Sequence, residues 1–430
     1  MSFARKLGLA FIMVAATALL GCDRADPTDR QANKQAGNTQ PIEPGPDVQK
    51  RLQRAFIAAK PGDVIELAAG TFELTGTLSL DVKDVTIRGQ GKDKTVLDLS
   101  GQEAGTGGEG LQVTAGPILI EDLAIENARG DALKVTGADG VTIRRVRTEW
   151  TGGPSEKNGS YGIYPVQCKN VLVEHCVASG ASDAGIYVGQ SQNIIVRHNR
   201  ATHNVAGIEI ENSIDADVYE NHTSNNAGGI LVFSLPNLPA KNGRGCRVFK
   251  NEIVENNHPN FAGEGNIVAM VPPGTGLMIM AYDDVEVFDN TFQDNGTVNV
   301  GILSYLVTEK KYDDPDYDPY PEGIAVHDNT FTGGGDMPAG EMGKKLSILV
   351  GGKFPDIAYD GIVDEKKLVE GKLPDKFRLS IHDNGDADFA NLDLANFDLA
   401  RLKFPKVSRD LAPHTGSRTA LRPVQLREVQ

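Results

Sequence analysis

The chain has 430 residues, of which 40% are hydrophobic, and its 58 acidic and 43 basic side chains give a net charge of -15. The hydrophobic share is too high for a disordered chain, and the 48 glycines follow no three-residue period of the collagen kind. Such an acidic balance lacks the basic patches that nucleic acids bind, so we expect neither DNA nor RNA as a partner.

The first 21 residues are typical of a signal peptide. Arg5 and Lys6 precede an uncharged apolar run over residues 7–20, which is too short for a comfortable membrane span. The run ends in Leu-Leu-Gly-Cys and resembles the lipobox of bacterial lipoproteins, which implies that residues 1–21 are removed and that Cys22 carries lipid. Two or more acyl chains would hold the protein at a membrane. The alternative is a single anchor helix with an incidental cysteine.

Two short segments lead into the body of the chain. Residues 22–46 are polar, contain Pro and Gly and have no apolar periodicity, so we expect a disordered tether behind the lipidated cysteine. Residues 47–60 are amphipathic, with Val48, Leu52, Ala55 and Phe56 on one face, and predict a helix that caps the core.

Residues 61–390 consist of one internal repeat with steps of 22 and 23 residues. The segments YGIYPVQCKNVLVEHC, AGIYVGQSQNIIVRHN and AGIEIENSIDADVYEN align beneath one another, and apolar residues alternate within each of them. This alternation predicts strands, and three short strands per step cannot close a core, so we expect the steps to stack as coils. Two sequence features recur along the coils. One is a repeat position that is usually Asn, at Cys176, Asn199, Asn221, Asn251, Asn290, Asn329 and Asn384. The other is a Gly-Ile or Gly-Leu pair that begins at Gly162, Gly185, Gly207, Gly229, Gly276 and Gly301.

This pattern resembles the right-handed parallel β-helix of pectate lyases, polygalacturonases, alginate epimerases and nitrous-oxide-reductase accessory proteins. The resemblance implies an all-β fold of about a dozen coils, with an internal asparagine ladder and a C-terminal cap or tail over residues 391–430. The lipobox, GIYVGQS, NVAGIEIENS, GGILVFSLPN, VPPGTG and YDPYPEGIAVHDN further resemble a family of exported bacterial β-helix proteins without an assigned activity. That closer resemblance implies export and an exported partner, and it supplies no catalytic residues.

The cysteines other than Cys22 are predicted to stay unpaired. The repeat places Cys176 and Cys246 inward, on different coils and in different columns. Cys168 and Cys176 are separated along one strand by more than the roughly 7 Å between Cα atoms that a disulfide tolerates. We therefore predict no disulfide.

Alternation places two columns of side chains on the outer face of the strands that follow each Gly-Ile pair. The columns are predicted to run Tyr164, Tyr187, Glu209, Leu231, Met278, Leu303 and Val166, Gly189, Glu211, Phe233, Met280, Tyr305. Their lower half is an apolar strip, and such strips mark binding sites or buried interfaces. Insertions over 234–246, 257–273 and 306–322 either fold over this strip as a second core or wall a groove with a floor of Tyr164, Tyr187, Glu209 and Glu211.

Glu209 and Glu211 are the acidic pair that we consider first for chemistry. Their Cβ atoms should lie about 6 to 7 Å apart on one strand face, a spacing that overlaps the range of about 6.5 to 9.5 Å between the carboxyls of inverting glycosidases. Paired carboxylates could also hold Ca²⁺, and the remaining interpretation is a solvated acidic face. His203 or Tyr187 is the predicted base.

Other metal sites are considered as alternatives. Asp313, Asp314, Asp316 and Asp318 could bind Ca²⁺, although their spacing lacks the Gly and the distal Glu of an EF-hand loop. His175 and His198 occupy equivalent slots, which repeat symmetry alone explains. Soft ligands for Cu(I) could come from Met270, Met278, Met280 and His258.

Signatures of known enzymes with this fold are missing. The Asp-Pro-His-Asp motif of mannuronan epimerases is replaced by Tyr164-Pro-Val-Gln, and the polygalacturonase signatures are absent. We therefore expect a monomeric module, lipid-anchored in a bacterial cell envelope at the periplasmic face of either membrane, that binds a glycan or an exported protein. The alternative is a lyase, epimerase or hydrolase that acts on an acidic or neutral polysaccharide in a lateral groove.

Overall fold

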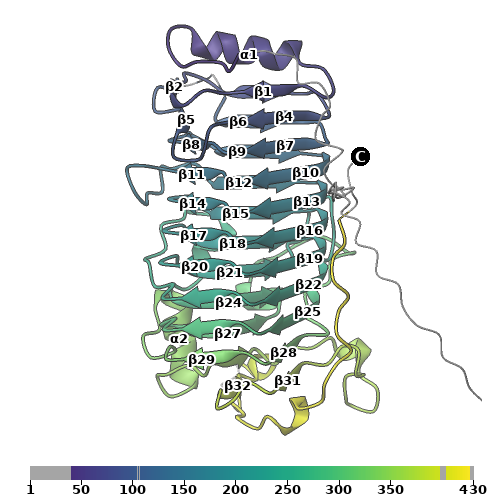
Figure 1. Cartoon of the computed structure of the whole chain (residues 1–430). Coiled ribbons are helices and arrows are strands. Elements are labelled where there is room, and N and C mark those ends of the chain that lie inside the picture. The colour runs from purple at the N-terminus through teal and green to yellow at the C-terminus, as the bar shows by residue number, and fades with distance from the viewer. Residues whose placement is uncertain (1–39, 104, 106, 398–402, 427–430) are drawn as a thin grey trace, which may run out of the picture. The chain divides into compact units, whose positions relative to one another are not determined.

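Three parallel sheets form the walls of one coil that winds through the described residues of the computed structural model, which are 40–103, 105, 107–397 and 403–426 (Figure 1). Each turn contributes strands to the sheets in the same order, and each strand pairs in parallel with its equivalent on the next turn. The sheets contain 11, 10 and 11 strands, so the predicted single-stranded parallel β-helix is confirmed. The predicted signal peptide, Cys22 and the predicted tether up to residue 39 lie outside the described residues. The last part of the predicted tether is not disordered but belongs to the fold, because Ile42 forms a parallel bridge with Leu67 and packs on the core.

The strands are short and follow the predicted repeat. The first sheet contains β1 (Val64–Glu66), β4 (Val85–Arg88), β7 (Ile118–Glu121), β10 (Asp139–Arg144), β13 (Lys169–Glu174), β16 (Gln192–Arg197), β19 (Ile214–Tyr219), β22 (Arg244–Phe249), β25 (Asp283–Phe288), β28 (Ala325–His327) and β31 (Ser380–His382). The second sheet contains β2 (Gly70–Glu73), β5 (Thr95–Asp98), β8 (Ala124–Glu126), β11 (Arg147–Glu149), β14 (Val177–Ser179), β17 (Arg200–Thr202), β20 (His222–Ser224), β23 (Glu252–Val254), β26 (Thr291–Gln293) and β29 (Thr330–Thr332). The third sheet contains β3 (Leu78–Leu80), β6 (Leu111–Val113), β9 (Leu133–Thr136), β12 (Tyr161–Val166), β15 (Ala184–Gly189), β18 (Ala206–Glu211), β21 (Gly228–Phe233), β24 (Thr275–Met280), β27 (Val298–Leu303), β30 (Ile357–Tyr359) and β32 (Phe389–Asn391).

A helix closes the N-terminal end of the coil, as predicted. Helix α1 (Val48–Ala58) buries Val48, Leu52 and Phe56 against the first turn, because these residues share one helical face. Figure 1 shows α1 lying across this end, where the strand edges would otherwise be unpaired. No helix within the described residues is long and apolar enough to span a membrane.

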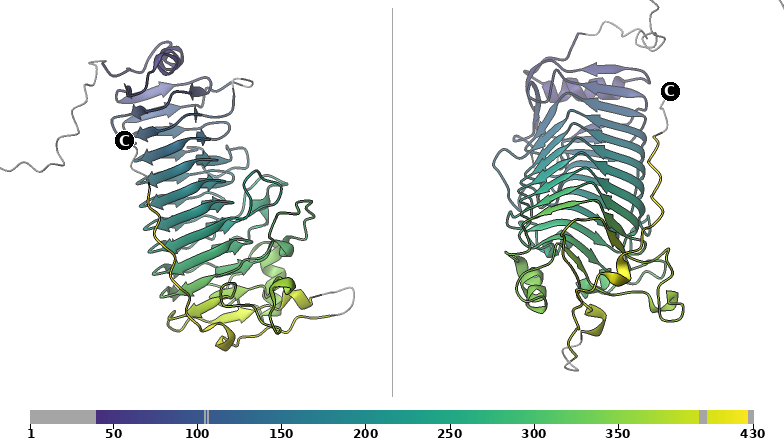
Figure 2. Two further views of the ribbon diagram at one scale, coloured as in Figure 1. Left: turned by 90° about the vertical axis from the view of Figure 1, so that its right-hand side faces the viewer. Right: turned by 60° about the horizontal axis from the view of Figure 1, so that its bottom comes forward.

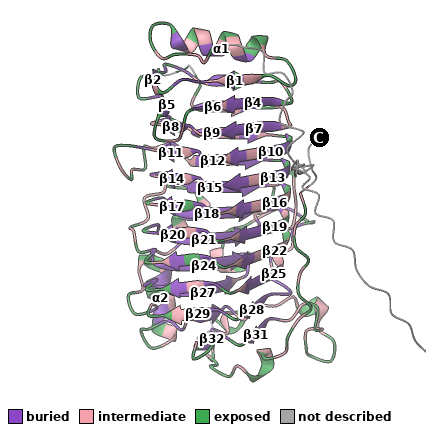
Figure 3. Ribbon diagram, viewed as in Figure 1, coloured by how far each residue is buried: buried purple, intermediate pink, exposed green. Residues whose placement is uncertain are grey.

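Alternating side chains point into one continuous apolar core. Val171, Ile194, Ala216, Cys246 and Val285 occupy equivalent inward places on successive strands of the first sheet. The strands are largely buried, whereas exposed residues concentrate in the loops (Figure 3). Cys246 thus occupies an inward position that is aliphatic in the neighbouring coils. The three cysteines within the described residues are free and buried, which confirms the prediction of no disulfide.

The predicted asparagine ladder lies inside the coil at the bend between the first and second sheets. Asn251 illustrates its geometry: its Nδ2 donates to the Val218 carbonyl and to Asn290 Oδ1, both at 2.9 Å. Its Oδ1 accepts from the backbone N and the Nδ2 of Asn221, both at 3.0 Å. The residue before each ladder position, such as His198, has a positive φ, so the ladder satisfies backbone groups at a sharp left-handed bend.

A second ladder, which the sequence analysis missed, lies at the bend between the second and third sheets. Asn204, Asn226, Asn256 and Asn295 bond one another from coil to coil, with side-chain separations of 2.9 to 3.2 Å. Asn204 also satisfies the backbone N of Ala181 at 3.0 Å. These asparagines follow the first ladder by five residues in each coil, and that fixed offset was the signal available in the sequence.

The last long strand of the third sheet departs from the predicted columns. Leu303 lies opposite Met280, where we had predicted that it would follow Met278. Tyr305, predicted as the next residue of the second column, instead lies beyond the strand in the 3-10 helix η3 (Tyr305–Thr308). The predicted position of these two residues is therefore wrong by two places.

The register changes because Asn299 terminates the second ladder. Asn299, and not Gly301, occupies the place equivalent to Gly276. Its Oδ1 accepts from Asn295 Nδ2 at 3.0 Å, and its own amide donates to the carbonyl of Gly333 at 2.9 Å. The Gly-Ile pair is consequently displaced toward the end of β27.

The C-terminal region closes the coil and then returns along it. Helix α2 (Gly340–Leu349) follows β29, and β32 adds a last strand to the third sheet. The final described segment then runs back along the first sheet (Figures 1 and 2), where the backbone N of Leu421 donates to Glu286 at 2.9 Å and that of Val424 to Asp217 at 3.1 Å. The C-terminal region thus contributes both a last coil and a tail.

Asn251→Ala is predicted to lower the free energy of unfolding by about 2 to 4 kcal/mol, because it leaves the Asn221 N–H buried without a partner and removes the side-chain hydrogen bonds to the Val218 carbonyl and to Asn290. Urea unfolding followed by far-ultraviolet circular dichroism would measure the change. Asn266→Ala is the matched control, since Asn266 is exposed and its side chain forms no capping hydrogen bond. Equal losses in the two variants would contradict the role of the ladder.

Candidate functional site

Six polar side chains gather on the outer face of the third sheet, at the level of β12, β15 and β18. They include the predicted residues Tyr164, Tyr187, Glu209 and Glu211. Strand pairing sets Tyr187 beside Glu209 and Gly189 beside Glu211. We call this group the tyrosine–carboxyl cluster, and its members are Tyr161, Tyr164, Asp183, Tyr187, Glu209 and Glu211.

The three tyrosines pack against one another at the surface side of the cluster. The ring centroid of Tyr161 lies 4.3 Å from that of Tyr164 and 4.8 Å from that of Tyr187. Tyr187 is buried, whereas Tyr161 and Tyr164 are partly exposed. The Tyr187 hydroxyl reaches across to donate a hydrogen bond to Glu211 Oε2. This path passes over Gly189, where a Cβ atom would collide with the Tyr187 ring and hydroxyl.

The three carboxyl groups are almost completely buried and lack cationic partners. Glu209 is 1% exposed, Glu211 6% and Asp183 7%. Within the described parts of the chain, no Lys, Arg or His forms an ion pair with any of them. Glu209 Oε1 and Asp183 Oδ1 are buried without a hydrogen-bond partner. Burying polar groups without partners lowers the stability of the folded chain, and the backbone pairing of the strands does not require carboxyl groups at these positions.

Burial moves the acid–base equilibria of the cluster to neutral pH. It raises the pKa of Glu211 to about 7, against the opposing effect of the Tyr187 hydrogen bond. Burial and the negative charge of Glu211 raise the pKa of Asp183 to about 7. The pKa of Glu209 is raised well above its usual range by burial, and then by Asp183 and Glu211. The cluster therefore holds protons near pH 7, where carboxyl groups of this kind can both donate and accept them.

Two members of the cluster were missed in the sequence. Asp183 immediately precedes the strand β15, at a place where the following coils have Val205 and Ala227. Tyr161 begins the first segment of the aligned repeat. The charged residue that interrupts an apolar repeat position was the available signal for Asp183.

The structure places His203 in the exposed bend before β18. Its Nδ1 lies 2.9 Å from Thr202 Oγ1, and its ring lies 6.0 Å from that of His258. Among the described residues, no hydrogen bond or ring contact joins His203 to Glu209. Its role as a base stays a prediction.

The insertions cover most of the apolar strip, as the first of the two predicted alternatives required. Leu231, Phe233, Met278, Met280 and Tyr305 are buried, and Leu303 is partly buried. They pack with Val268 and Val271 from the insertion 257–273, which contains the 3-10 helix η2 (Ile267–Met270), and with Tyr317 from the insertion 306–322. The residues that were predicted as the polar floor of a groove belong to the tyrosine–carboxyl cluster. This cluster lies at the edge of the second core that is nearer the N-terminal end of the coil.

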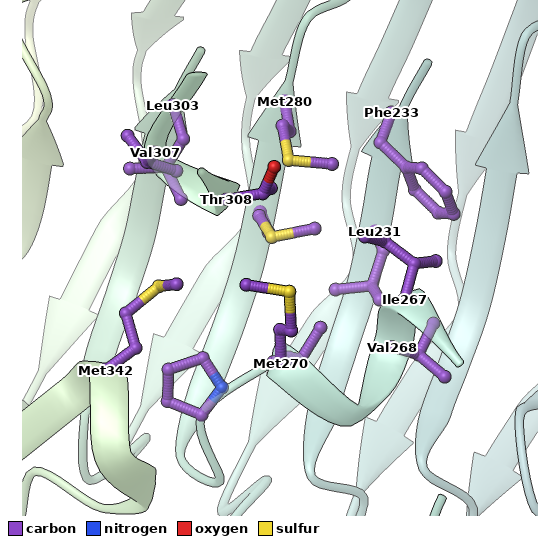
Figure 4. A pocket seen from close by; sticks show the side chains of 13 residues that line it. Leu231, Phe233, Ile267, Val268, Met270, Met280, Leu303, Val307, Thr308 and Met342 are labelled. Atoms are coloured by element: carbon purple, nitrogen blue, oxygen red, sulfur yellow. The ribbon is translucent and has the colours of Figure 1, made fainter. Parts of the chain in front are cut away.

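A small apolar cavity remains between the strip and its covering loops. Its volume is about 40 Å³, which is too little for a sugar ring. Figure 4 shows Leu231, Phe233 and Met280 on the sheet side of this cavity and Met270 and Met342 on the opposite side. Met270, Met278 and Met280 from the Cu(I) alternative line the cavity, whereas His258 does not. His258 packs on Phe261, with ring centroids 5.5 Å apart.

The four aspartates of the insertion 306–322 do not assemble into one site. Asp314 is buried and forms an ion pair with Lys241, while Asp313 and Asp316 are exposed. Asp318 instead approaches two acidic residues that we had not considered, and this trio is the one group within the described residues whose spacing suits a metal ion. The predicted Ca²⁺ loop is therefore wrong in its composition, because Asp314 is already neutralised by a lysine.

Comparisons with known proteins agree with this topology. A family model described as the right handed beta helix region matches residues 72–242, and the fold is the right-handed parallel β-helix. The A-module of a mannuronan C-5 epimerase from Azotobacter vinelandii is similar over 78% of this chain and 89% of its own, with 18% identity and a TM-score of 0.52. A polygalacturonase from Erwinia carotovora is similar over 71% of this chain and 95% of its own, with 13% identity and a TM-score of 0.44. No curated protein matches the sequence.

Glu211→Gln is predicted to flatten the dependence of stability on pH. The folded chain keeps a proton on Glu211 up to a pKa of about 7, whereas the unfolded chain releases it near the ordinary value of 4.5. The resulting stabilisation is complete below pH 4.5, and about 3 kcal/mol is lost as the pH rises toward 7. Glutamine carries no such proton, so urea unfolding should give a smaller difference between acidic and neutral buffer.

The matched control for this measurement is Glu220→Gln. Glu220 is exposed and lies in the bend after β19, outside the cluster. Glu220 pairs with His198 at 3.2 Å, and because such an exposed pair contributes little to stability, its variant should keep the steep pH dependence of the unaltered chain. The same slope in Glu211→Gln and the unaltered chain would contradict the assignment.

Proposed function

We propose that the protein is a polysaccharide-active β-helix enzyme that transfers protons at the tyrosine–carboxyl cluster. The observation that carries the proposal is the hydrogen-bonded pair of Tyr187 and Glu211, in which a buried carboxyl group has a pKa of about 7. Clusters of strongly shifted pKa values are typical of active sites, because a general acid or base works best when its pKa lies near the working pH.

The exposure of the cluster residues suggests a division of roles. Glu211 and Asp183 retain some contact with solvent and are the proposed proton donor and acceptor. Glu209 lies deeper and remains protonated behind them. The partly exposed rings of Tyr161 and Tyr164 offer an amphipathic surface on which sugar rings can pack. A lyase or an epimerase, which moves one proton at a sugar carbon, suits this arrangement better than a hydrolase that needs both Glu209 and Glu211 at the surface.

The fold supports the same class of substrate by analogy. The Azotobacter vinelandii protein, whose fold is similar, is named as an epimerase of mannuronan. This analogy supports polysaccharide chemistry in general and transfers no catalytic residue, since function resides in the site and not in the fold.

A non-catalytic module is the second candidate. The closure of the apolar strip and the 1% exposure of Glu209 favour it, because a substrate would not reach that carboxyl without movement. In this case the outer face would bind a glycan or an exported protein without turnover.

We also propose that the protein is anchored in a bacterial cell envelope through lipid on Cys22 and faces the periplasm as a monomer. The sequence before the helical cap supports this location, since a short apolar run ends in the Leu-Leu-Gly-Cys tetrapeptide. The net charge of -15 gives no indication of a nucleic-acid partner, so a polysaccharide or an exported protein is proposed instead.

Turnover of uronate polysaccharides is the expected activity. Ultraviolet absorbance would detect the unsaturated product of a lyase, proton exchange into solvent would detect an epimerase, and reducing ends would detect a hydrolase. Glu211→Gln should lower the rate about 100-fold or more, because it removes the proposed acid–base group. Glu220→Gln should leave the rate unchanged. No turnover by the unaltered protein on any of these substrates, with identical glycan binding in both variants, would exclude the enzyme.

Cys22→Ser is predicted to release the protein from the membrane. When the full gene is expressed in a bacterium, the unaltered chain should sediment with membranes and its N-terminal peptide should carry acyl chains by mass spectrometry. Cys168→Ser is the matched control and should remain in the membrane fraction, since Cys168 is buried in the coil. Membrane binding by Cys22→Ser would exclude lipid anchoring.

A further inference from the structure

Three carboxylates from separate parts of the chain meet beside the first sheet, away from the tyrosine–carboxyl cluster. Asp283 begins β25, and Asp318 and Glu322 lie at the end of the insertion that leads into β28. Each residue offers a carboxylate oxygen, and these three oxygens all lie within 4.8 Å of one another. This spacing is compatible with coordination of a single cation.

Backbone hydrogen bonds hold the three residues in this arrangement. The backbone N of Glu322 donates to Asp283 Oδ1 at 3.2 Å, and the backbone N of Asp284 donates to the Glu322 carbonyl at 2.8 Å. The backbone N of Tyr320 donates to Asp318 Oδ1 at 3.1 Å. The carboxylates are therefore positioned by the fold of the insertion and not by the chance placement of flexible side chains.

One lysine neutralises only part of the charge. Lys367 Nζ lies 2.8 Å from Asp318 Oδ2 and 2.6 Å from Glu322 Oε2. Asp283 forms no ion pair with a Lys or Arg among the described residues. When all four groups are ionised, three carboxylates and one ammonium have a net charge of two negative units. The two positive charges of one divalent cation would balance it.

Glu322 provides a second, independent observation that points to a cation. It is 4% exposed, and its Oε1 is buried without a hydrogen-bond partner, although its Oε2 accepts from Lys367. A buried carboxylate oxygen without a partner is costly, and a metal ion would remove that cost.

We propose that Asp283, Asp318 and Glu322 bind one Ca²⁺ ion, and that Lys367 competes with the ion for Asp318 and Glu322. The donors are all oxygen, which favours hard cations over Zn²⁺ or Cu(I). Ca²⁺ accepts irregular sets of carboxylates and waters, whereas Mg²⁺ requires a near-octahedral shell. The ion would tie the insertion 306–322 to β25. Because Tyr317 of this insertion covers the apolar strip, binding would stabilise that cover.

Calorimetric titration of the full chain after removal of metals with a chelator tests the proposal. One Ca²⁺ should bind per chain, the melting temperature should rise, and Mg²⁺ should bind more weakly. Glu322→Gln should weaken Ca²⁺ binding about tenfold or more, and Lys367→Met should strengthen it about tenfold, since the charge of the ligand set tunes Ca²⁺ affinity. Asp313→Asn, an exposed change in the same insertion, is the matched control and should bind as the unaltered chain does.

The opposite effects of the two variants keep the test decisive. If Glu322→Gln fails to fold, as circular dichroism would reveal, the gain in affinity expected from Lys367→Met still distinguishes the outcomes. Absence of Ca²⁺ binding in both the unaltered chain and Lys367→Met would overturn the proposal. Binding that neither substitution alters would place the ion elsewhere, and equal affinity for Mg²⁺ would overturn the assignment to Ca²⁺. None of these outcomes depends on polysaccharide turnover.

Discussion

The hydrogen bonds of the inner asparagines are the interaction on which the rest of the structure depends. Each coil turns between sheets through a residue with positive φ, such as His198 or Glu220, and the bend leaves backbone groups pointing into an interior without water. Asn199 and Asn221 satisfy these groups and also bond each other at 3.0 Å. The same amide that stabilises one bend therefore sets the position of the next coil, and the two ladders align all three sheets.

Because the interior is reserved for amides and aliphatic side chains, the chemistry of this protein is confined to the outward positions. One outward column changes from Tyr187 through Glu209 to Leu231 in three successive coils, without any change of the backbone. The insertions cover the apolar part of this face and form a second core. The tyrosine–carboxyl cluster lies where that cover ends, so its carboxyls are buried by neighbouring tyrosines and loops and yet remain close to the surface.

The acidic side chains of this protein are compensated in different ways, and the contrast distinguishes structural from functional groups. Asp217 is paired with Arg247 and receives the backbone N of Val424, so it contributes to holding the C-terminal tail. Glu211 and Glu209 have no cationic partner among the described residues, and protonation is the remaining way to neutralise them. The next coil places Leu231 and Phe233 at the equivalent outward positions, so the fold itself does not require carboxyl groups there, which is the pattern expected where function opposes stability.

The sequence by itself determined the repeat, the inward and outward faces, the capping helix and the first ladder, because each of these follows from local periodicity. It also identified Glu209, Glu211, Tyr187 and Tyr164 as neighbours, since their spacing within each coil is fixed by the strand period. Tertiary structure alone decided where the insertions fold, since nothing in the order of residues 306–322 specifies that Asp318 and Glu322 meet Asp283. It likewise decided the register of β27, where Asn299 closes a ladder begun three coils earlier, and the pKa of Glu211, which depends on burial by residues from other coils. Both are cooperative properties of packed coils, and no local pattern contains them.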